Sequence, residues 1–296
     1  MPNIAIVWDF DGTLTPDDST TKVVEALEGK GKGSEFWGYI KSLRGDTPLP
    51  EWEHILASDA PIWMYSLARI AFRRKVPLNT EFFREFVLPN ITLFPNVVPF
   101  LRTIKNMENL PEFREMNLHI HHFIVSAGLK DLIQQVFPDG LITWVFGCRY
   151  TVVVQEGFEN DPEESVPVFC MDETMKTRAL FEISKGSFND PKKHVNRRVP
   201  ERNLWASFRN IIYIGDSDTD VPALALTRDR GGLGVGVFNP LKAEDENTQK
   251  KLKKLRINRR ADLITPANFS EKGELFDYLK MRCIQIRQRY AAEKHT

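Results

Sequence analysis

The sequence has little of several features that would each point to a particular class of protein. Its three cysteines, Cys148, Cys170 and Cys283, are odd in number, widely spaced and not part of a C-x-x-C pair. A disulfide framework or a zinc site is therefore not expected, and a reducing cytoplasmic location fits better. Basic and acidic residues number 40 each, so the formal net charge is zero. Without an excess of either charge, we expect neither nucleic acid nor an anionic membrane surface as a partner.

Long apolar runs are also missing. No stretch comes near the roughly 18 uninterrupted apolar residues that a membrane-spanning helix needs. The first apolar run is short, has no basic lead and passes directly into acidic residues, which is not the pattern of a secretory signal peptide. We therefore expect a cytoplasmic globular protein whose 296 residues suffice for one or two domains.

What the sequence does have is a distinctive opening. Residues 4–8, IAIVW, are continuously apolar, which predicts a strand buried on both faces, as in a parallel sheet. Asp9 and Asp11 follow directly, and Gly12 then turns the chain. Because buried carboxylates are costly without a compensating charge, two of them at the end of a core strand indicate a nearby cation. Taken alone, the pattern fits a solvated Asp-Gly turn at least as well.

The rest of the chain divides into two parts. Residues 16–90 show helical patterns and no strand-like run, whereas strands and helices alternate from residue 91 onward. We therefore predict an α/β core of residues 1–15 and 91–296, built on a doubly wound parallel sheet, with an inserted all-helical cap of residues 16–90. A hairpin around the acidic loop 156–164 is assigned to the core. Helices are predicted in the cap to about Leu27 and at 35–44, 51–57, 62–74 and 80–87, and in the core at 129–137.

Polar side chains follow three of the predicted strands. The first aspartate pair follows the opening strand, Ser126 follows a strand at 118–125, and Asp216 and Asp220 follow a strand at 210–214. In a parallel sheet these carboxyl ends share one edge, so the three groups can converge. Lys176 lies near the start of a helix that begins at the same edge. Carboxylates suit Mg²⁺, and a metal, a lysine and backbone donors together suit a phosphate group.

Together these motifs resemble those of the haloacid dehalogenase-like (HAD) superfamily. DFDGTLT at 9–15, Ser126, Lys176 and GDSDTD at 215–220 stand in the order of that family and span the whole core. The helical insert resembles the C1-type cap of the phosphoserine phosphatase-like subfamily. The resemblance implies a HAD-like Rossmannoid core. It also implies a Mg²⁺-dependent phosphomonoester hydrolase that acts on a small phosphorylated metabolite.

The resemblance also implies a role for each matching acidic residue. Asp9 matches the nucleophile that forms an aspartyl-phosphate, and Asp11 matches the general acid/base that protonates the leaving oxygen and then activates water. Asp9, the backbone carbonyl of Asp11 and Asp216 match the Mg²⁺ ligands. Asp220 matches the residue that holds a metal-bound water or the lysine, a role that Asp218 could also fill.

The expected phosphate-binding residues come from the same resemblance. Ser126 matches the hydroxyl that bonds a phosphoryl oxygen, helped by the amide of Ala127 or Gly128. Lys176 matches the lysine that pairs with both the nucleophile and the phosphate. Ser126 also fits an N-cap of the following helix, and the two roles are compatible.

Several other residues allow more than one interpretation. Lys185 and, less well, Lys130 compete with Lys176, which is preferred because it opens a helix while Lys185 ends one. The glycines at 232–236 do not have the G-x-G-x-x-G spacing and predict a core strand. Three histidines, His119, His121 and His122, lie on or beside a predicted strand, so packing is favoured over a metal site. We interpret the basic loop 187–202 as a solvated loop or as a site for an acidic partner.

Two alternatives to a hydrolase remain open. A phosphomutase would use the same residues, and a HAD-fold binding or regulatory protein would show little turnover. Substrate choice is expected to lie in the cap, where Glu25, Glu28 and Arg44 are candidates for contacting the substrate. The sequence leaves both the substrate and the oligomeric state open.

Overall fold

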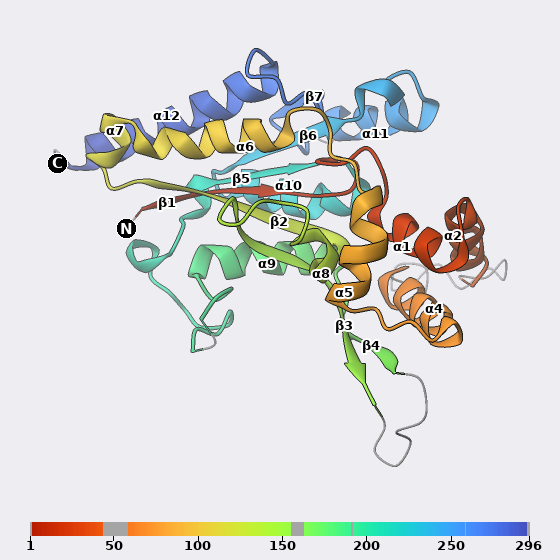
Figure 1. Ribbon diagram of the computed structural model, residues 1–296. Coiled ribbons are helices and arrows are strands. Elements are labelled where there is room, and N and C mark those ends of the chain that lie inside the picture. The colour runs from red at the N-terminus through yellow and green to blue at the C-terminus, as the bar shows by residue number, and fades with distance from the viewer. Residues whose placement is uncertain (1, 44–58, 155–162, 191, 258, 295–296) are drawn as a thin grey trace.

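The computed structural model describes residues 2–43, 59–154, 163–190, 192–257 and 259–294. Its centre is a seven-stranded sheet with the order β4-β3-β2-β1-β5-β6-β7 (Figure 1). All neighbouring strands are parallel except β3 and β4, which are antiparallel. The predicted α/β fold with a mainly parallel sheet is therefore confirmed. The strands are β1 (Asn3–Trp8), β2 (His119–Leu129), β3 (Ile142–Val153), β4 (Glu164–Phe169), β5 (Ile211–Gly215), β6 (Leu233–Phe238) and β7 (Leu263–Pro266).

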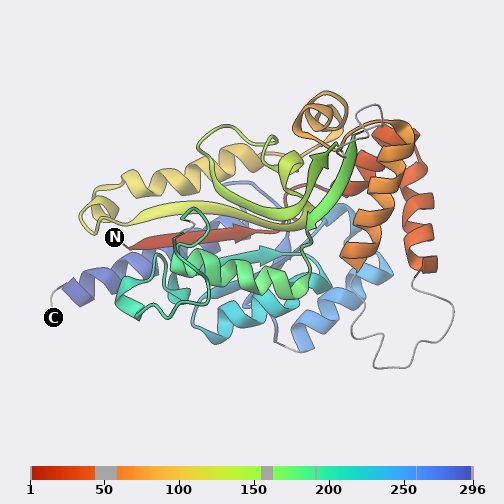
Figure 2. The ribbon, with the colours of Figure 1, turned by 90° about the horizontal axis from the view of Figure 1, so that it is seen from below.

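Helices cover both faces of the sheet because the side chains of its central strand are apolar on both sides. Ile4, Ile6 and Trp8 of β1 share one apolar core with α6 and α12. Ala5 and Val7 share a second core with α9 and α10 on the opposite face. Figure 2 shows the sheet between these two layers. The helices are α6 (Val97–Asn106), α9 (Glu173–Lys185), α10 (Val221–Asp229) and α12 (Glu274–Lys294). Helix α7 (Pro111–Arg114) adds Phe113 to the first core, and α11 (Glu246–Ile257) adds Leu255 to the second.

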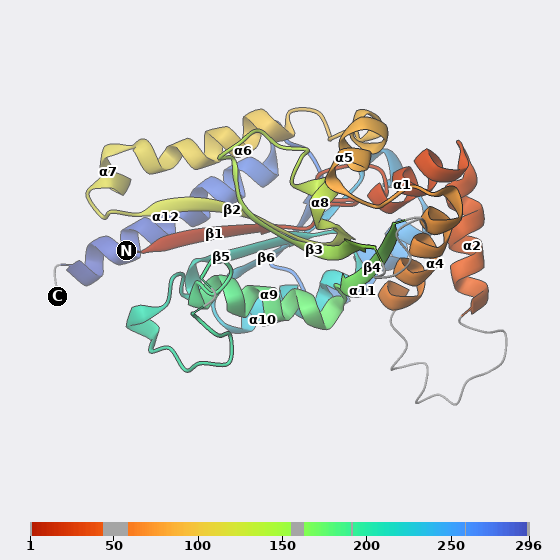
Figure 3. The same cartoon turned by 60° about the horizontal axis from the view of Figure 1, so that its bottom comes forward.

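The described part of the insert, residues 16–43 and 59–90, contains helices and no strand. The helices at 19–28, 32–43 and 59–74 lie together beyond the end of the sheet at which β1 ends (Figure 3). The predicted helix at 51–57 lies outside the described residues. The elements are α1 (Ser19–Glu28), α2 (Lys32–Leu43), α4 (Asp59–Arg74) and α5 (Thr80–Phe82), followed by a π-helical turn (Phe83–Val87) and a 3-10 turn (Leu88–Asn90).

The predicted hairpin is present as β3 and β4, but it does not belong to the core alone. Tyr150 of β3 donates its hydroxyl to the carbonyl of Met64 in α4 at 2.7 Å. The amide of Leu78, which follows α4, donates to Oγ of Ser165 in β4 at 2.8 Å. The hairpin therefore joins the sheet to the helical insert. The division into residues 1–15 with 91–296 and residues 16–90 stays a prediction.

One core helix is shorter than predicted. The helix expected at 129–137 is reduced to α8 (Lys130–Ile133): β2 continues through Ser126 as far as Leu129, and the helix gives way to turns after Ile133. Leu129 pairs with Cys148 of β3, so the backbone beyond Ser126 is still held by the sheet. Among the described residues, no helix is both long and apolar enough to cross a membrane.

Candidate active site

The sheet order brings the two main acidic motifs together. Asp9 follows β1 and Asp216 follows β5, and these strands are direct neighbours. The amide of Asp9 donates to the carbonyl of Ile214 at 2.8 Å, which fixes the end of one strand against the other. Carboxylate oxygens of Asp9, Asp216 and Asp220 lie within 4.8 Å of one another. Three of the predicted acids, Asp9, Asp216 and Asp220, therefore form one cluster at the carboxyl edge of the sheet.

Lys176 supplies the positive charge in this cluster. Its side chain is buried, and its Nζ lies 3.2 Å from Oδ1 of Asp9 and 2.6 Å from Oδ1 of Asp220. The helix that carries it begins after Asp172, whose side chain accepts the amide of Met175 at 2.7 Å as an N-cap. Lys176 thus sits in the first turn of α9, at the edge where β1 and β5 end.

Neither competing lysine enters the cluster. Nζ of Lys185 donates to the carbonyl of Val195 at 2.5 Å, at the far end of α9. Nζ of Lys130 lies 4.1 Å from the ring centroid of Trp144. The preference for Lys176 on the basis of its place in the helix agrees with this geometry.

Asp220 holds the lysine in place. Its Oδ1 accepts from Lys176 and from the hydroxyl of Tyr213, both at 2.6 Å. Its Oδ2 accepts from the amide and the hydroxyl of Ser217 at 3.0 and 2.7 Å. With four donors on two oxygens, this carboxylate is fully occupied by the protein. Asp218, the alternative residue for this role, is largely exposed and lies outside the cluster.

The buried charges in the cluster shift one another's pKa values. Burial first, and then repulsion from Asp220, raise the pKa of Asp9 well above its usual value, although Lys176 opposes this. Burial would raise the pKa of Asp220 as well, but the ammonium of Lys176 reverses the effect and lowers it. Burial would lower the pKa of Lys176, but attraction to Asp220 and Asp9 raises it overall. The stable ion pair is therefore Lys176 with Asp220, while Asp9 retains uncompensated repulsion.

Asp11 is held differently. Its two oxygens accept from the amide and the hydroxyl of Ser19, at 2.8 and 2.9 Å. Burial and the charge of Asp18 raise the pKa of Asp11 to about 8, and the bonds from Ser19 limit the rise. A Cβ at Gly128 would lie 2.8 Å from Oγ of Ser19 and 3.2 Å from Oδ2 of Asp11, so a glycine is needed beside this pair. The acid/base candidate is therefore tied to the first residue of α1.

Ser126 lies in β2, the other neighbour of β1, and is buried. Its Oγ accepts the amide of Gly128 at 2.9 Å. The alternative role as a helix N-cap is wrong, because α8 begins after Leu129 and no side chain caps it. Since the Gly128 amide is already used by Ser126, the Ala127 amide is the better candidate for contacting a phosphate.

The acidic cluster also fits the expected metal. Gly12 has a φ of +76°, and a Cβ there would lie 2.3 Å from Oδ2 of Asp216. Only glycine allows the carboxylate of Asp216 to approach the turn that follows Asp11. Asp9 and Asp216 thus offer hard oxygen ligands of the kind that Mg²⁺ takes, and a cation there would relieve the repulsion on Asp9. The residues present therefore fit a divalent cation.

Several residues near the cluster are not predicted as site residues by the sequence. Asp18 and Ser19 carry only an N-cap signal, and Asp18 does cap α1 by accepting the amide of Thr21 at 2.6 Å. Tyr213 reads as an apolar core residue, although a buried tyrosine hydroxyl needs a partner, which is the available signal. Ser217 lies inside the recognised motif, but its bonds to Asp220 depend on the fold of that loop.

The cap residues named as substrate contacts have other partners. Oε1 of Glu25 accepts the amide of Gly31 at 2.9 Å, and Oε1 of Glu28 lies 2.7 Å from Nε of Arg74. Both acids belong to the end of α1 opposite to Ser19. Arg44 lies outside the described residues. These contacts place Glu25 and Glu28 in the structure of the cap rather than at the acidic cluster.

The histidines and glycines behave as packing residues. Nε2 of His122 is 2.9 Å from the carbonyl of Leu101, and its Nδ1 accepts Nε1 of Trp8 at 3.1 Å. His122 lies in β2 and its side chain is completely buried against α6, and no cluster of possible metal ligands in the described chain includes it. The glycines at 232–236 lie in or beside β6, a core strand, as predicted.

The comparisons with known proteins show which fold this is. No family model matches the chain. An uncharacterized protein of Borreliella burgdorferi is 25% identical over 300 residues, covering 96% of this chain and 98% of that protein. A phosphoserine phosphatase in apo form superimposes with a TM-score of 0.52 at 14% identity, covering 94% of this chain and 98% of that one. A HAD family hydrolase from Salmonella enterica serovar Typhi has a TM-score of 0.52 at 16% identity, covering 84% and 66% of the two chains. The predicted resemblance is confirmed at the level of the fold: the chain has the haloacid dehalogenase fold in its phosphoserine phosphatase-like form.

Proposed function

We infer that this protein is a Mg²⁺-dependent phosphomonoester hydrolase that acts through an aspartyl-phosphate on a small phosphorylated metabolite. The observation that carries the proposal is the contact between Asp9 and Lys176 at 3.2 Å, inside a cluster of three carboxylates at the carboxyl ends of β1 and β5. A nucleophilic carboxylate needs charge compensation before it can approach a phosphoryl group, and the lysine supplies part of it.

Each residue has a distinct task in this proposal. Asp9 attacks phosphorus, and Asp11, whose raised pKa keeps it protonated near neutral pH, donates its proton to the leaving oxygen. Asp11, now ionised, then takes a proton from the water that hydrolyses the aspartyl-phosphate. Lys176, Ser126 and the amide of Ala127 bind the phosphoryl oxygens.

Asp9, Asp216 and the carbonyl of Asp11 would hold the Mg²⁺. When bound, this ion neutralises negative charge between the nucleophile and the phosphoryl oxygens. Asp220 contributes indirectly, because one of its four hydrogen bonds comes from Lys176 and the other three, from Tyr213 and Ser217, hold its carboxylate in place. The three cysteines are free, which suits the cytoplasmic location that we propose.

A phosphatase screen tests this function. Purified protein with Mg²⁺ is given a broad panel of phosphomonoesters, and released inorganic phosphate is measured with and without EDTA. We expect release from part of the panel, loss of release in EDTA, and loss of release in Asp9→Asn. Asp218→Asn is the matched control, because it removes an acid from the same region outside the cluster. Release that persists in Asp9→Asn or in EDTA would contradict the proposal, and an isomerised product without phosphate release would favour a mutase.

A further inference from the structure

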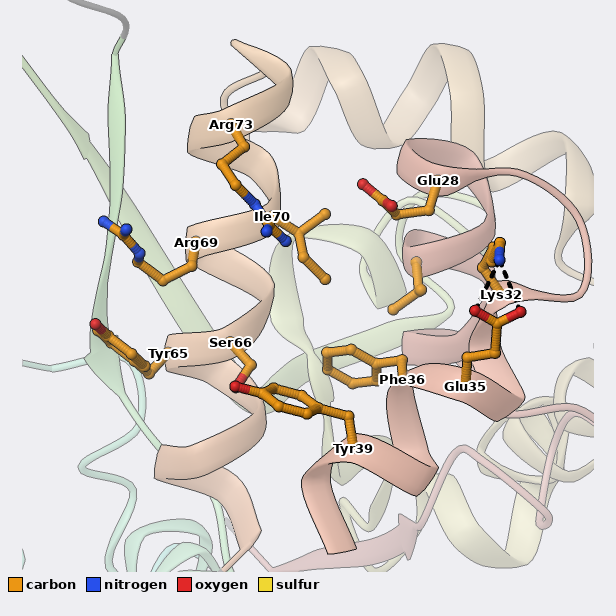
Figure 4. Close-up of a pocket in the computed structure, with 11 residues that line it drawn as sticks. Glu28, Lys32, Glu35, Phe36, Tyr39, Tyr65, Ser66, Arg69, Ile70 and Arg73 are labelled. Atoms are coloured by element: carbon orange, nitrogen blue, oxygen red, sulfur yellow. Dashed lines mark hydrogen bonds and ion pairs between the residues drawn. The ribbon is translucent and has the colours of Figure 1, made fainter. Parts of the chain in front are cut away.

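A groove of about 590 Å³ lies between the helices of the cap, apart from the acidic cluster. Residues from α1, α2 and α4 line it (Figure 4). Val24, Phe36 and Ser66 are buried and form its floor. Tyr39 and Tyr65 line it too, and both are large aromatic side chains that are more than half exposed. The volume falls within the range of sites that hold a small organic molecule.

The side chains that line the groove carry more positive than negative charge. Both of its acids are already paired: Glu35 with Lys32 at 2.7 Å, and Glu28 with Arg74 at 2.7 Å. Arg69 and Arg73 also line the groove, one helical turn apart on α4. Within the described part of the chain, neither of these two arginines forms an ion pair or a hydrogen bond. Neither guanidinium is therefore held in an ion pair, so both add positive charge to the groove, although Figure 4 shows Arg69 extending away from Arg73 on the other side of α4.

The arrangement of the side chains brings positive charge and apolar surface together. In Figure 4 the guanidinium of Arg73 turns into the groove from α4, toward the space above Phe36 of α2. The ring of Tyr39 reaches across from α2 toward Ser66 of α4. A guanidinium fork binds phosphate or carboxylate oxygens in pairs, and exposed aromatic rings stack on flat apolar groups. A ligand that joins an anionic group to a flat ring would satisfy both features.

The groove is separate from the catalytic cluster. Helix α1 runs between the two, with Ser19 bound to Asp11 at its start and Glu28 lining the groove at its end. Nine residue steps of about 1.5 Å separate Ser19 from Glu28 by about 13.5 Å along the helix. Among the described residues that line the groove, both acids are held in ion pairs, so the groove is suited to binding rather than to a second reaction.

From these observations we propose that the groove between α1, α2 and α4 is a second ligand site, which binds a small aromatic anion of the nucleoside monophosphate type. Arg73 binds the anionic group, Arg69 adds positive charge at the edge of the groove, and Tyr39 contacts the flat ring. Because such a ligand touches three helices of the cap at once, its binding stabilises them against unfolding.

Binding is tested with AMP as the probe, by calorimetric titration in EDTA so that the metal-dependent site is disabled. Adenosine and inorganic phosphate are titrated separately to show whether both halves of the ligand are needed. We expect AMP to bind at least about tenfold more tightly than either half, and to bind about tenfold or more weakly in the double variant Arg69→Gln/Arg73→Gln. Arg102→Gln, which removes an exposed arginine from α6, is the control and leaves AMP affinity unchanged.

Both arginines of the double variant are exposed, so this variant is expected to fold, and its thermal midpoint without ligand verifies that. AMP should raise the midpoint of the wild-type chain and of Arg102→Gln but not that of the double variant. The proposal is overturned if AMP fails to bind at about 1 mM. It is equally overturned if AMP binds the double variant and the wild type alike, or if phosphate alone binds as tightly as AMP.

Discussion

Two aspartates that stand two residues apart in the sequence have different surroundings in the fold. Asp9 faces Lys176, Asp216 and Asp220, whereas Asp11 turns to Ser19 and Asp18. In the first environment burial and Asp220 raise the pKa of the carboxyl, and Lys176 together with a bound cation would hold it ionised as a nucleophile. The second raises the pKa of the carboxyl to about 8, as a general acid at neutral pH requires.

Substitutions beside Asp11 should move the pH dependence of the reaction in opposite directions. The proton on Asp11 is needed for leaving-group departure, so kcat/KM should fall as pH rises through its pKa. Asp18→Asn removes a repelling charge and keeps an N-cap for α1, so the pKa of Asp11 falls and the alkaline limb moves to lower pH. Ser19→Ala removes a hydrogen bond to the charged form, so the limb moves to higher pH. Profiles that are the same in both variants would contradict the role of Asp11.

A buried histidine makes stability depend on pH for a structural reason. Nδ1 of His122 accepts a hydrogen from Trp8 while its Nε2 faces the carbonyl of Leu101, so only the neutral ring satisfies both partners. Burial lowers the pKa of His122 to about 3. The unfolded chain, with a histidine pKa near 6.5, binds this proton first as the pH falls. The stability that His122 contributes is therefore complete above about pH 6.5 and is lost as the pH falls toward 3.

The variant His122→Gln should lack this part of the pH dependence of stability. Between about pH 6 and about pH 4, the free energy of unfolding of the wild type should fall more steeply, by about 1.4 kcal/mol per pH unit. Urea denaturation at several pH values measures both slopes. Equal slopes would mean that His122 does not titrate on unfolding as described.

At the scale of elements, the β3–β4 hairpin has a role that its sequence does not reveal. Alternating residues and an acidic loop predict a hairpin, and the hairpin exists, but the pattern carries no information about its neighbours. The hydroxyl of Tyr150 reaches Met64, and Ser165 accepts the amide of Leu78. The hairpin is thus a brace between the sheet and α4.

Removing one contact of this brace should loosen it. Tyr150→Phe removes the hydroxyl's bond to the carbonyl of Met64, which keeps its own helix bond within α4, so the substitution should cost about 0.5–1.5 kcal/mol of stability. Tyr65→Phe, an exposed tyrosine on the same α4, is the control and should change stability by less than about 0.5 kcal/mol. Urea denaturation gives the cost, and limited proteolysis of the folded protein shows whether the cap opens. Equal effects of the two substitutions would contradict the brace.

Other differences between predicted and observed elements also arise from contacts with distant parts of the chain. Val125 is followed by Ser126 and two small residues, which reads as the end of a strand, yet pairing of Leu129 with Cys148 keeps the backbone extended. That pairing is made with a strand later in the chain, so the local pattern could not reveal it. In contrast, the predicted helix that Lys176 opens and Lys185 ends is present as α9, because Asp172 caps its start and Gly186 ends it.

At the scale of the whole molecule, the convergence of the site is predictable from the sequence and its internal bonding is not. A parallel sheet necessarily places the ends of β1, β2 and β5 at one edge, so the order of the motifs along the chain is enough to group Asp9, Ser126 and Asp216. The hydrogen bonds from Ser19 to Asp11 and from Tyr213 to Asp220 depend on side-chain directions in the folded state. Strand patterns and motif spacing do not encode those directions.

The central claim is that Asp9 is the nucleophile, and trapping its phosphorylated form tests it most directly. The enzyme is mixed with a substrate found in the phosphatase screen, quenched during turnover and reduced with borohydride, which converts an aspartyl-phosphate to homoserine. Peptide mass spectrometry then reads the residue at each aspartate. We predict homoserine at position 9 in the wild type and at no aspartate in Asp9→Asn. Homoserine at another aspartate, or phosphate release with no trapped residue at any quench time, would contradict the account.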